Sequence, residues 1–366
     1  MTFSVSLPNT TGRLPPLRIM VVDDSVVMRG LISRMCGEDP AAMEVVATAA
    51  NGQLAVERAA KRDIDVVVLD IEMPVLDGIS ALPKLLAIDP RIVVIMASSL
   101  TSRNAEISLK ALEKGAKDYV PKPSSVVTVN GGEEFKRELL EKIRALGARY
   151  RRAPVEAPAR IAPAVRAPAL RAAHFAKPYA LAFGSSTGGP TALTQVLKAI
   201  PAPLRVPVFI TQHMPATFTA LLAQNITRET GHSCVEARHG DIVTPGRIHL
   251  APGDHHMTIA RSGAHGVINL NQGAKENFCR PAVDPMLRSL ADFYQRNLLV
   301  VILTGMGQDG LAGSEVVVKA GGSVLAQDEE SSVVWGMPGA VARAGLCNAV
   351  LPLSQMAGEI QRMLTA

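Results

Sequence analysis

Asp65-Val66-Val67-Val68-Leu69-Asp70 is the stretch that decides the fold of this chain. Its four central residues are apolar without a break, and an acid follows directly. A strand that is apolar on both faces is typical of a parallel sheet covered by helices on both sides. Similar runs, separated by helical stretches, occupy residues 18–22, 44–48, 92–96 and 117–120. The pattern predicts a five-stranded parallel α/β sheet with helices on both faces.

Polar side chains follow four of these runs at the point where each strand ends. Asp23, Asp24 and Asp70 supply three carboxylates, a donor set that suits Mg²⁺. Ser98 adds a hydroxyl and Lys122 adds a cation, and together they could stabilise a transferring phosphoryl group. A single acid at a strand end is usually an ordinary solvated loop residue. Five matching residues at the carboxyl edge of one sheet favour a binding site.

These residues belong to longer motifs that resemble a known family. The motifs are Asp23-Asp24, residues 69–74 with Asp77-Gly78, Ser98, and residues 119–123. With them the unit resembles a response-regulator receiver domain over about residues 17–145, which implies a flavodoxin-like, five-stranded parallel sheet. Tyr119 stands at the place of the aromatic switch residue of that family.

The resemblance implies a role for each polar residue. Asp70 would be the phospho-acceptor, and Asp23 and Asp24 would bind Mg²⁺ together with it. Ser98 would meet the phosphoryl oxygen and Lys122 would pair with it. Phosphorylation would then shift a surface between two states.

The charge of the chain is concentrated in one segment. The sequence has 366 residues and a formal net charge of +5, with a pI near 9.1, which raises the question of nucleic-acid binding. Residues 148–178 contain seven cations, one anion, 11 alanines and 5 prolines, so this segment carries +6 and the remainder −1. We expect a proline-stiffened linker there rather than a nucleic-acid interface. The predicted organisation is a receiver domain at 17–147, the linker at 148–178 and a second domain at 179–366.

The C-terminal unit also alternates strands and helices. Residues 179–183, 206–211, 298–303 and 323–326 are its best strand candidates, which predicts a second doubly wound α/β domain with a mainly parallel sheet. Three strand ends carry polar residues. The first is a small-residue loop with Ser185 and Ser186, the second contains His213, and the third runs from Thr304 through Asp309. Taken alone, each could be a phosphate-binding turn, a helix cap or a packing group.

The third loop contains a G-x-G-x-x-G pattern formed by Gly305, Gly307 and Gly310. Asp328 lies about 20 residues further on, where a dinucleotide site places its ribose-binding acid. A nucleotide-binding regulatory module is therefore one alternative function. The position of Asp309 inside the loop counts against it, because a carboxylate would repel a pyrophosphate.

Ser186, His213 and Asp309 together indicate a different chemistry. A serine hydroxyl is a weak nucleophile until a base takes its proton, and the base needs a third group to fix its tautomer. Three strand ends of one parallel sheet can bring these side chains together at its carboxyl edge. The chain order Ser, His, Asp differs from the orders found in chymotrypsin, subtilisin and the α/β-hydrolases.

Six segments of the C-terminal unit form longer motifs: residues 184–189, 211–215, 248–257, 280–284, 303–310 and 336–338. These motifs resemble those of the CheB-type protein-glutamate methylesterase and protein-glutamine glutaminase family. The resemblance implies Ser186 as nucleophile, His213 as base, Asp309 as orienting acid and Met306 in the oxyanion region, with no cofactor in this domain. Residue 185 is serine where the family usually has alanine, so a second hydroxyl adjoins the nucleophile.

The family resemblance also implies a reaction and partners. Ser186 would attack glutamyl methyl esters on methyl-accepting chemotaxis receptors, releasing methanol, and glutamines would be deamidated through the same intermediate. A histidine kinase of the chemotaxis type would phosphorylate Asp70 and so lift a block by the receiver domain. A non-catalytic protein that docks and takes up phosphoryl groups is the remaining alternative.

Other features of the sequence indicate the cellular compartment of the protein. No apolar run approaches the ~18 residues of a membrane span, and the N-terminus does not resemble a secretory signal. The four cysteines match neither a disulfide framework nor a zinc site, which indicates a reducing cytoplasm. We expect a cytoplasmic monomer that neither binds nucleic acid nor inserts into a membrane.

Overall fold

The computed structural model describes residues 15–123, 129–152, 170–171, 176–263 and 265–365. Its N-terminal domain contains a five-stranded, wholly parallel sheet, as the sequence predicts, and the strand order is β2-β1-β3-β4-β5. The strands are β1 (Leu17–Val22), β2 (Met43–Ala49), β3 (Val66–Asp70), β4 (Val93–Ser98) and β5 (Asp118–Pro121). The helices are α1 (Val26–Gly37), α2 (Gly52–Ala59), α3 (Gly78–Ile88), α4 (Ser102–Glu113) and α5 (Val129–Arg152).

Local sequence explains where these helices begin. Ser25, Asn51, Asp77 and Thr101 each precede a helix, and each side-chain oxygen accepts a hydrogen bond from a backbone N–H of the first turn. Strand β3 is buried along its whole length, which is why its sequence is apolar without alternation. The polar side chains that follow the strands therefore lie together at the carboxyl edge of the parallel sheet.

The C-terminal domain contains a seven-stranded parallel sheet in the order β14-β13-β12-β6-β7-β9-β8, which confirms the predicted fold class. A separate antiparallel hairpin, β10–β11, was not anticipated from the sequence. The strands are β6 (Ala180–Ser185), β7 (Val208–Gln212), β8 (Ser233–Glu236), β9 (Arg247–Leu250), β10 (His256–Ser262), β11 (His265–Asn271), β12 (Leu298–Ile302), β13 (Ser323–Gln327) and β14 (Ala349–Leu351).

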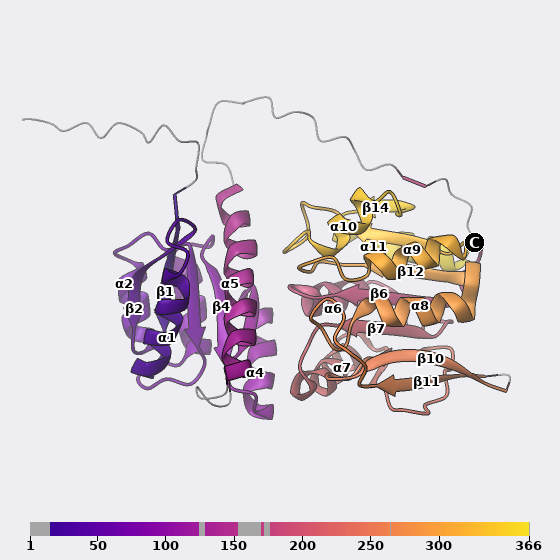
Figure 1. Ribbon diagram of the computed structural model, residues 1–366, viewed down its shortest axis with the longest axis horizontal. Coiled ribbons are helices and arrows are strands. Elements are labelled where there is room, and N and C mark those ends of the chain that lie inside the picture. Colours follow the sequence, from indigo (N-terminus) through magenta and orange to yellow (C-terminus); the bar gives the residue numbers. More distant parts are fainter. Residues whose placement is uncertain (1–14, 124–128, 153–169, 172–175, 264, 366) are drawn as a thin grey trace, which may run out of the picture.

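Helices cover both faces of this sheet (Figure 1). They are α6 (Gly189–Lys198), α7 (Ala216–Thr230), α8 (Val283–Tyr294), α9 (Leu311–Lys319), α10 (Met337–Arg343) and α11 (Leu353–Thr365), with a short 3₁₀ helix at Gln295–Asn297. No helix in the described ranges is long and apolar enough to cross a membrane.

The two domains face each other through α4 and α5 of the first and α6 and α7 of the second (Figure 1). At their boundary the rings of Tyr119 and Phe218 stack with centroids 4.4 Å apart and an interplanar angle of 8°. Helix α5 continues to Arg152, so it includes the first five residues of the segment expected as a linker. Residues 153–169 and 172–175 of that segment lie outside the described residues.

Candidate active site

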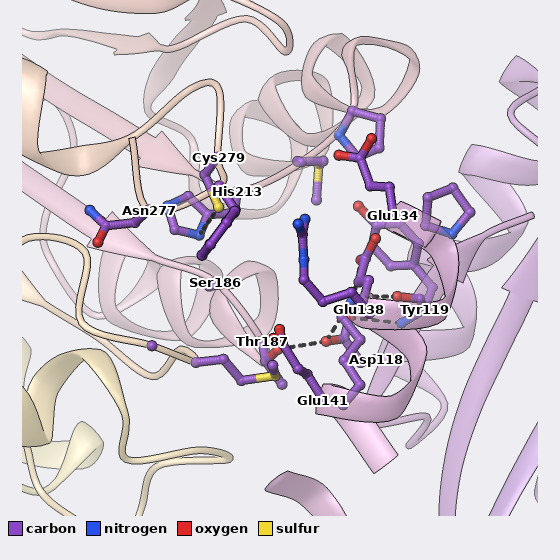
Figure 2. Close-up of a pocket in the computed structure, with 18 of the residues that line it drawn as sticks. Asp118, Tyr119, Glu134, Glu138, Glu141, Ser186, Thr187, His213, Asn277 and Cys279 are labelled. Carbon is purple, nitrogen blue, oxygen red and sulfur yellow. Dashed lines mark hydrogen bonds and ion pairs between the residues drawn. The ribbon is translucent and has the colours of Figure 1, made fainter. Parts of the chain in front are cut away.

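The carboxyl ends of three neighbouring strands form the candidate site. Strands β12, β6 and β7 are adjacent in the sheet, and each ends directly before one of the expected polar loops. Ser186 follows β6, His213 follows β7, and Asp309 lies in the loop between β12 and α9. All three residues line one groove, in which Figure 2 shows Ser186 beside His213. The topology therefore brings together the three residues named from the sequence.

His213 and Asp309 form the central hydrogen bond of the site. The Nε2 atom of His213 lies 2.7 Å from Oδ2 of Asp309, which is 1% exposed. The same carboxylate accepts hydrogen bonds from the backbone N–H groups of Val283 and Asp284. Burial alone would raise the pKa of Asp309, but the contact with His213 and these amide donors lower it below its ordinary value. Asp309 is therefore an anion that can orient the imidazole.

Two further residues, Asn277 and Asp284, hold Asp309 in position, and the sequence did not assign them to the site. The Asn277 side-chain amide donates to Oδ2 of Asp284 at 3.0 Å and to Oδ1 of Asp309 at 3.1 Å. Asp284 also accepts hydrogen bonds from the backbone N–H groups of Gly310 and Gly313. Burial, followed by the charge of Asp309, raises the pKa of Asp284 to about 6. Asp284 lay inside a quoted motif, whereas nothing in the sequence distinguished Asn277.

The adjacent hydroxyls of Ser185 and Ser186 have different surroundings. Ser185 is fully buried, and its Oγ donates to Oε1 of Gln212 at 2.6 Å. Gln212 in turn donates to the backbone carbonyls of Ser186 and His213. Ser186 is only half-buried and lies on the groove. Ser185 thus links the two loops internally, and Ser186 is the hydroxyl that a substrate can reach.

The segment from Gly305 to Met306 closely approaches Ser186. A Cβ atom on Gly305 would lie 2.9 Å from Cβ of Ser186 and would overlap the Met337 sulfur, so the position requires glycine. In the described part of the chain, no hydrogen bond uses the backbone N–H of Thr187 or of Met306. Both residues line the groove, and such free N–H groups are candidates to donate to an oxyanion.

The second nitrogen of the His213 ring contacts a thiol that the sequence analysis left without a role. Nδ1 of His213 lies 3.3 Å from Sγ of Cys279. None of the hydrogen bonds among the described residues joins His213 to the Ser186 hydroxyl. Burial lowers the pKa of His213, but the contacts with Cys279 and Asp309 outweigh it and raise that pKa to about 10.

The receiver domain forms the opposite wall of the groove, whose volume is about 1110 Å³. Asp118, Glu134 and Glu138 line it from that side, facing Ser186 and His213 (Figure 2). The Thr187 hydroxyl donates to Oδ2 of Asp118 at 2.7 Å. A buried hydrogen bond therefore joins the residue after Ser186 directly to the receiver.

The expected phosphorylation site also forms a cluster. Ligand atoms of Asp23, Asp24 and Asp70 lie within 4.8 Å of one another. The Lys122 ammonium is 2.6 Å from Asp23 and 2.7 Å from Asp70. Burial raises the pKa of Asp70 to about 6 although Lys122 opposes the shift. The Ser98 hydroxyl is buried, and none of the described residues forms a hydrogen bond with it.

Tyr119 does not lie in this cluster, since its ring stacks on Phe218 at the domain boundary.

The glycine pattern of the third loop has a structural explanation. Gly310 adopts a left-handed conformation with φ of 90° and precedes α9, while Asp309 is bonded to His213. Asp328 accepts hydrogen bonds from the backbone N–H and hydroxyl of Ser331. These contacts do not favour the nucleotide-binding alternative.

Comparisons with known proteins agree with both domains. A family model described as "CheB methylesterase" matches residues 181–360, and one described as "Response regulator receiver domain" matches residues 19–129. The protein-glutamate methylesterase/protein-glutamine glutaminase of Azospirillum brasilense is 50% identical, and the alignment covers 95% of this chain and 92% of that protein. The Nitrobacter hamburgensis protein of the same name is 52% identical over 96% of this chain and 95% of its own length.

A solved structure is also similar to the C-terminal domain. The crystal structure of the Thermotoga maritima CheB methylesterase catalytic domain has a TM-score of 0.49 and 35% sequence identity, covering 52% of this chain and 99% of that one.

The fold and the site define the class of protein as a response regulator whose receiver is joined to a hydrolase domain. The chain belongs to the CheB-type protein-glutamate methylesterase/protein-glutamine glutaminase family. The family predicted from the sequence is thereby confirmed.

Proposed function

We propose that this chain hydrolyses glutamate methyl esters on methyl-accepting chemotaxis receptors, with Ser186 as the nucleophile. The observation that carries the mechanism is the 2.7 Å contact of His213 Nε2 with Asp309 at the strand end next to Ser186. Because Nε2 is occupied by the carboxylate, Nδ1 is the nitrogen that accepts the serine proton.

The reaction then proceeds in two steps. Ser186 Oγ attacks the ester carbonyl as His213 takes its proton, and amides near Met306 stabilise the oxyanion. His213 returns the proton to the leaving methoxide, which departs as methanol and leaves an acyl-serine. Water, deprotonated by His213, attacks the acyl group, and His213 passes that proton to Ser186 Oγ as the acyl–oxygen bond breaks. Glutamate leaves, and Ser186 and His213 return to their starting states. A glutamine side chain enters the same route and loses ammonia instead of methanol.

The receiver site has the donors that a divalent cation needs. Asp23, Asp24 and Asp70 supply clustered carboxylates, the ligand type that Mg²⁺ prefers. When bound, Mg²⁺ would neutralise charge on the phosphoryl group during transfer to Asp70. Lys122 lies within ion-pair distance of Asp70 and is placed to pair with the phosphoryl group. The buried Ser98 hydroxyl, with its unused hydrogen-bonding capacity, would meet one of the phosphoryl oxygens.

The receiver would restrict the groove until Asp70 is phosphorylated by a chemotaxis-type histidine kinase. Strand β5 supports this route, since it begins with the interface residues Asp118 and Tyr119 and leads directly to Lys122 at the phosphorylation site. A change in the position of Lys122 can therefore move strand β5 and so alter the contacts at the domain boundary a few residues away. We place the reaction in the cytoplasm and expect a monomer, with residues 17–147 and 179–366 as its two domains.

Methanol release from a methylated receptor tests the proposal. Wild type, Ser186→Ala, His213→Ala and Asp309→Ala are compared, and the three variants should lose most of the activity. Ser186→Ala activity at the wild-type rate would refute the mechanism. Complete inactivity of the phosphorylated wild type would instead favour the non-catalytic phosphoryl-accepting protein.

Regulation is tested on the same substrate. Acetyl phosphate with Mg²⁺ should raise the rate of the wild type and leave Asp70→Ala unchanged. Absence of a response in the wild type would contradict regulation by the receiver, without affecting the assignment of Ser186.

A further inference from the structure

The His213 ring is engaged on both of its nitrogens. Asp309 occupies Nε2 at 2.7 Å, and the Cys279 thiol is 3.3 Å from Nδ1. In the mechanism proposed above, Nδ1 must accept the proton of Ser186. A nitrogen that already accepts the hydrogen of one group cannot accept that of another, so Cys279 competes with the serine for the base.

The segment that carries Cys279 is attached to the receiver domain. The Lys275 ammonium forms an ion pair with Glu134 of α5 at 2.6 Å. The guanidinium of Arg137, also on α5, lies 4.5 Å from the centroid of the Phe278 ring. Two contacts from one receiver helix thus restrain the residues next to Cys279 on its N-terminal side.

We propose that Cys279 is a positioning residue that keeps Nδ1 of His213 away from Ser186 while the receiver is docked. Release of α5 frees the segment around Phe278, and the thiol then leaves the ring. The receiver would in this way disable the base itself, in addition to covering the groove. This inference rests on the proposed function and deepens its regulation.

Cys279 differs from the other three cysteines of the chain, all of which lie in the described part. Cys36, Cys234 and Cys347 are buried, and burial raises the pKa of each thiol to about 12. Cys279 is partly exposed on the groove and contacts an imidazole. The remaining thiols pack in the cores, whereas Cys279 is placed where it can act on a catalytic group.

The test measures methanol release by unphosphorylated full-length protein. Cys279→Ala should raise kcat by about two- to tenfold, the range expected for loss of one competing hydrogen bond. Acetyl phosphate should reduce the difference between variant and wild type, because phosphorylation already frees the ring.

Cys279→Ser is the matched control, since its hydroxyl can still donate to Nδ1 and should keep the rate near the wild-type value. An unchanged or lower kcat for Cys279→Ala, or identical behaviour of the two variants, would refute the role of the thiol. Ser186→Ala separates the two proposals. If it is inactive and Cys279→Ala resembles wild type, only the present inference fails.

A measurement on the wild type removes any dependence on how the variants fold. The His213 imidazole is titrated by nuclear magnetic resonance with and without a beryllofluoride phosphoryl analogue. The pKa of His213 should change when the analogue binds, because the ring loses its contact with Cys279. An equal pKa in both states would contradict the coupling of the receiver to the base.

Discussion

At the scale of single residues, two adjacent serines differ in what surrounds them. Ser185 is fully buried and bonded to Gln212, whereas Ser186 reaches the groove. The sequence shows two hydroxyls side by side, and the family pattern alone favours the second. Burial supplies an independent physical reason for the same choice, because an attacking oxygen must contact the substrate.

Ser186→Ala should lower kcat by at least about a thousandfold, as loss of a nucleophile does in serine hydrolases. Ser185→Ala should lower kcat by less than about tenfold, because it removes only the hydrogen bond to Gln212 that links the two loops. Methanol release under saturating receptor gives both values. A larger loss for Ser185→Ala would reverse the assignment of the nucleophile.

Asp309→Asn should change both the height and the position of the pH profile. The carboxylate fixes the His213 tautomer, so kcat on the plateau of the pH profile should fall by about a hundred- to ten-thousandfold. Asp309 also raises the pKa of His213, and its neutralisation should therefore move the acidic limb to lower pH. A profile that falls in height without moving would show that the charge of Asp309 does not reach the imidazole.

At the scale of elements, the segment after β13 positions the candidate oxyanion region. The backbone carbonyl of Val334 accepts a hydrogen bond from Gly305 N–H at 3.0 Å, and Trp335 Nε1 donates to the carbonyl of Gln327 at 2.8 Å. The Gln327 side chain accepts from Thr304 N–H. The loop next to Ser186 is thus aligned by residues about 20 to 30 positions later in the chain.

Gly305→Ala should displace this loop, since its Cβ would lie 2.9 Å from Cβ of Ser186. We expect kcat to fall at least about tenfold and the protein to lose about 1–3 kcal/mol of stability. Gly358→Ala is the matched control, because its Cβ enters open space within α11 and should stabilise the helix slightly without changing activity. Methanol release and thermal unfolding of both variants check the prediction.

The sequence predicts long buried strands better than short ones. All five receiver strands and the sheet strands near Ser186, His213 and Asp309 are apolar runs that periodicity identifies. Strands β8, β9 and β14 have only three or four residues, and the β10–β11 hairpin pairs with itself outside the main sheet. Too few residues carry a pattern in such elements unless a motif adjoins them, as residues 119–123 do for the four-residue β5. The sequence did not identify Asn277 as a site residue for a different reason. Its role depends on contacts with Asp284 and Asp309, and no local motif encodes them.

At the scale of the whole molecule, the domain boundary combines an aromatic stack with a polar contact. Tyr119 and Phe218 stack across it, and Thr187 donates to Asp118 nearby. Each of these pairs joins residues about 70 to 100 positions apart, so local patterns in the sequence could not predict them. The two domains and the class of each were predictable, because each carries its own strand pattern and motifs.

Phe218→Leu should weaken the docking of the receiver. The stacked pair contributes about 0.5–1.5 kcal/mol beyond apolar burial, which corresponds to about a two- to tenfold change in the docking equilibrium. Basal methylesterase activity should rise by that factor, and activity after acetyl phosphate should stay constant. A variant with unchanged basal activity and normal thermal stability would show that the stack does not restrain the receiver.

The groove shared by the two domains has a further consequence for regulation. A receiver tethered to the catalytic domain competes with the receptor at a fixed effective concentration, whatever the amount of protein in the cell. A high concentration of receptor would therefore displace the receiver by mass action, in the same direction as phosphorylation would. Coupling free energies are reciprocal, so an occupied groove favours the phosphorylated form of Asp70 by the same factor. The phosphorylation state of Asp70 would then depend on the concentration of the substrate as well as on the kinase.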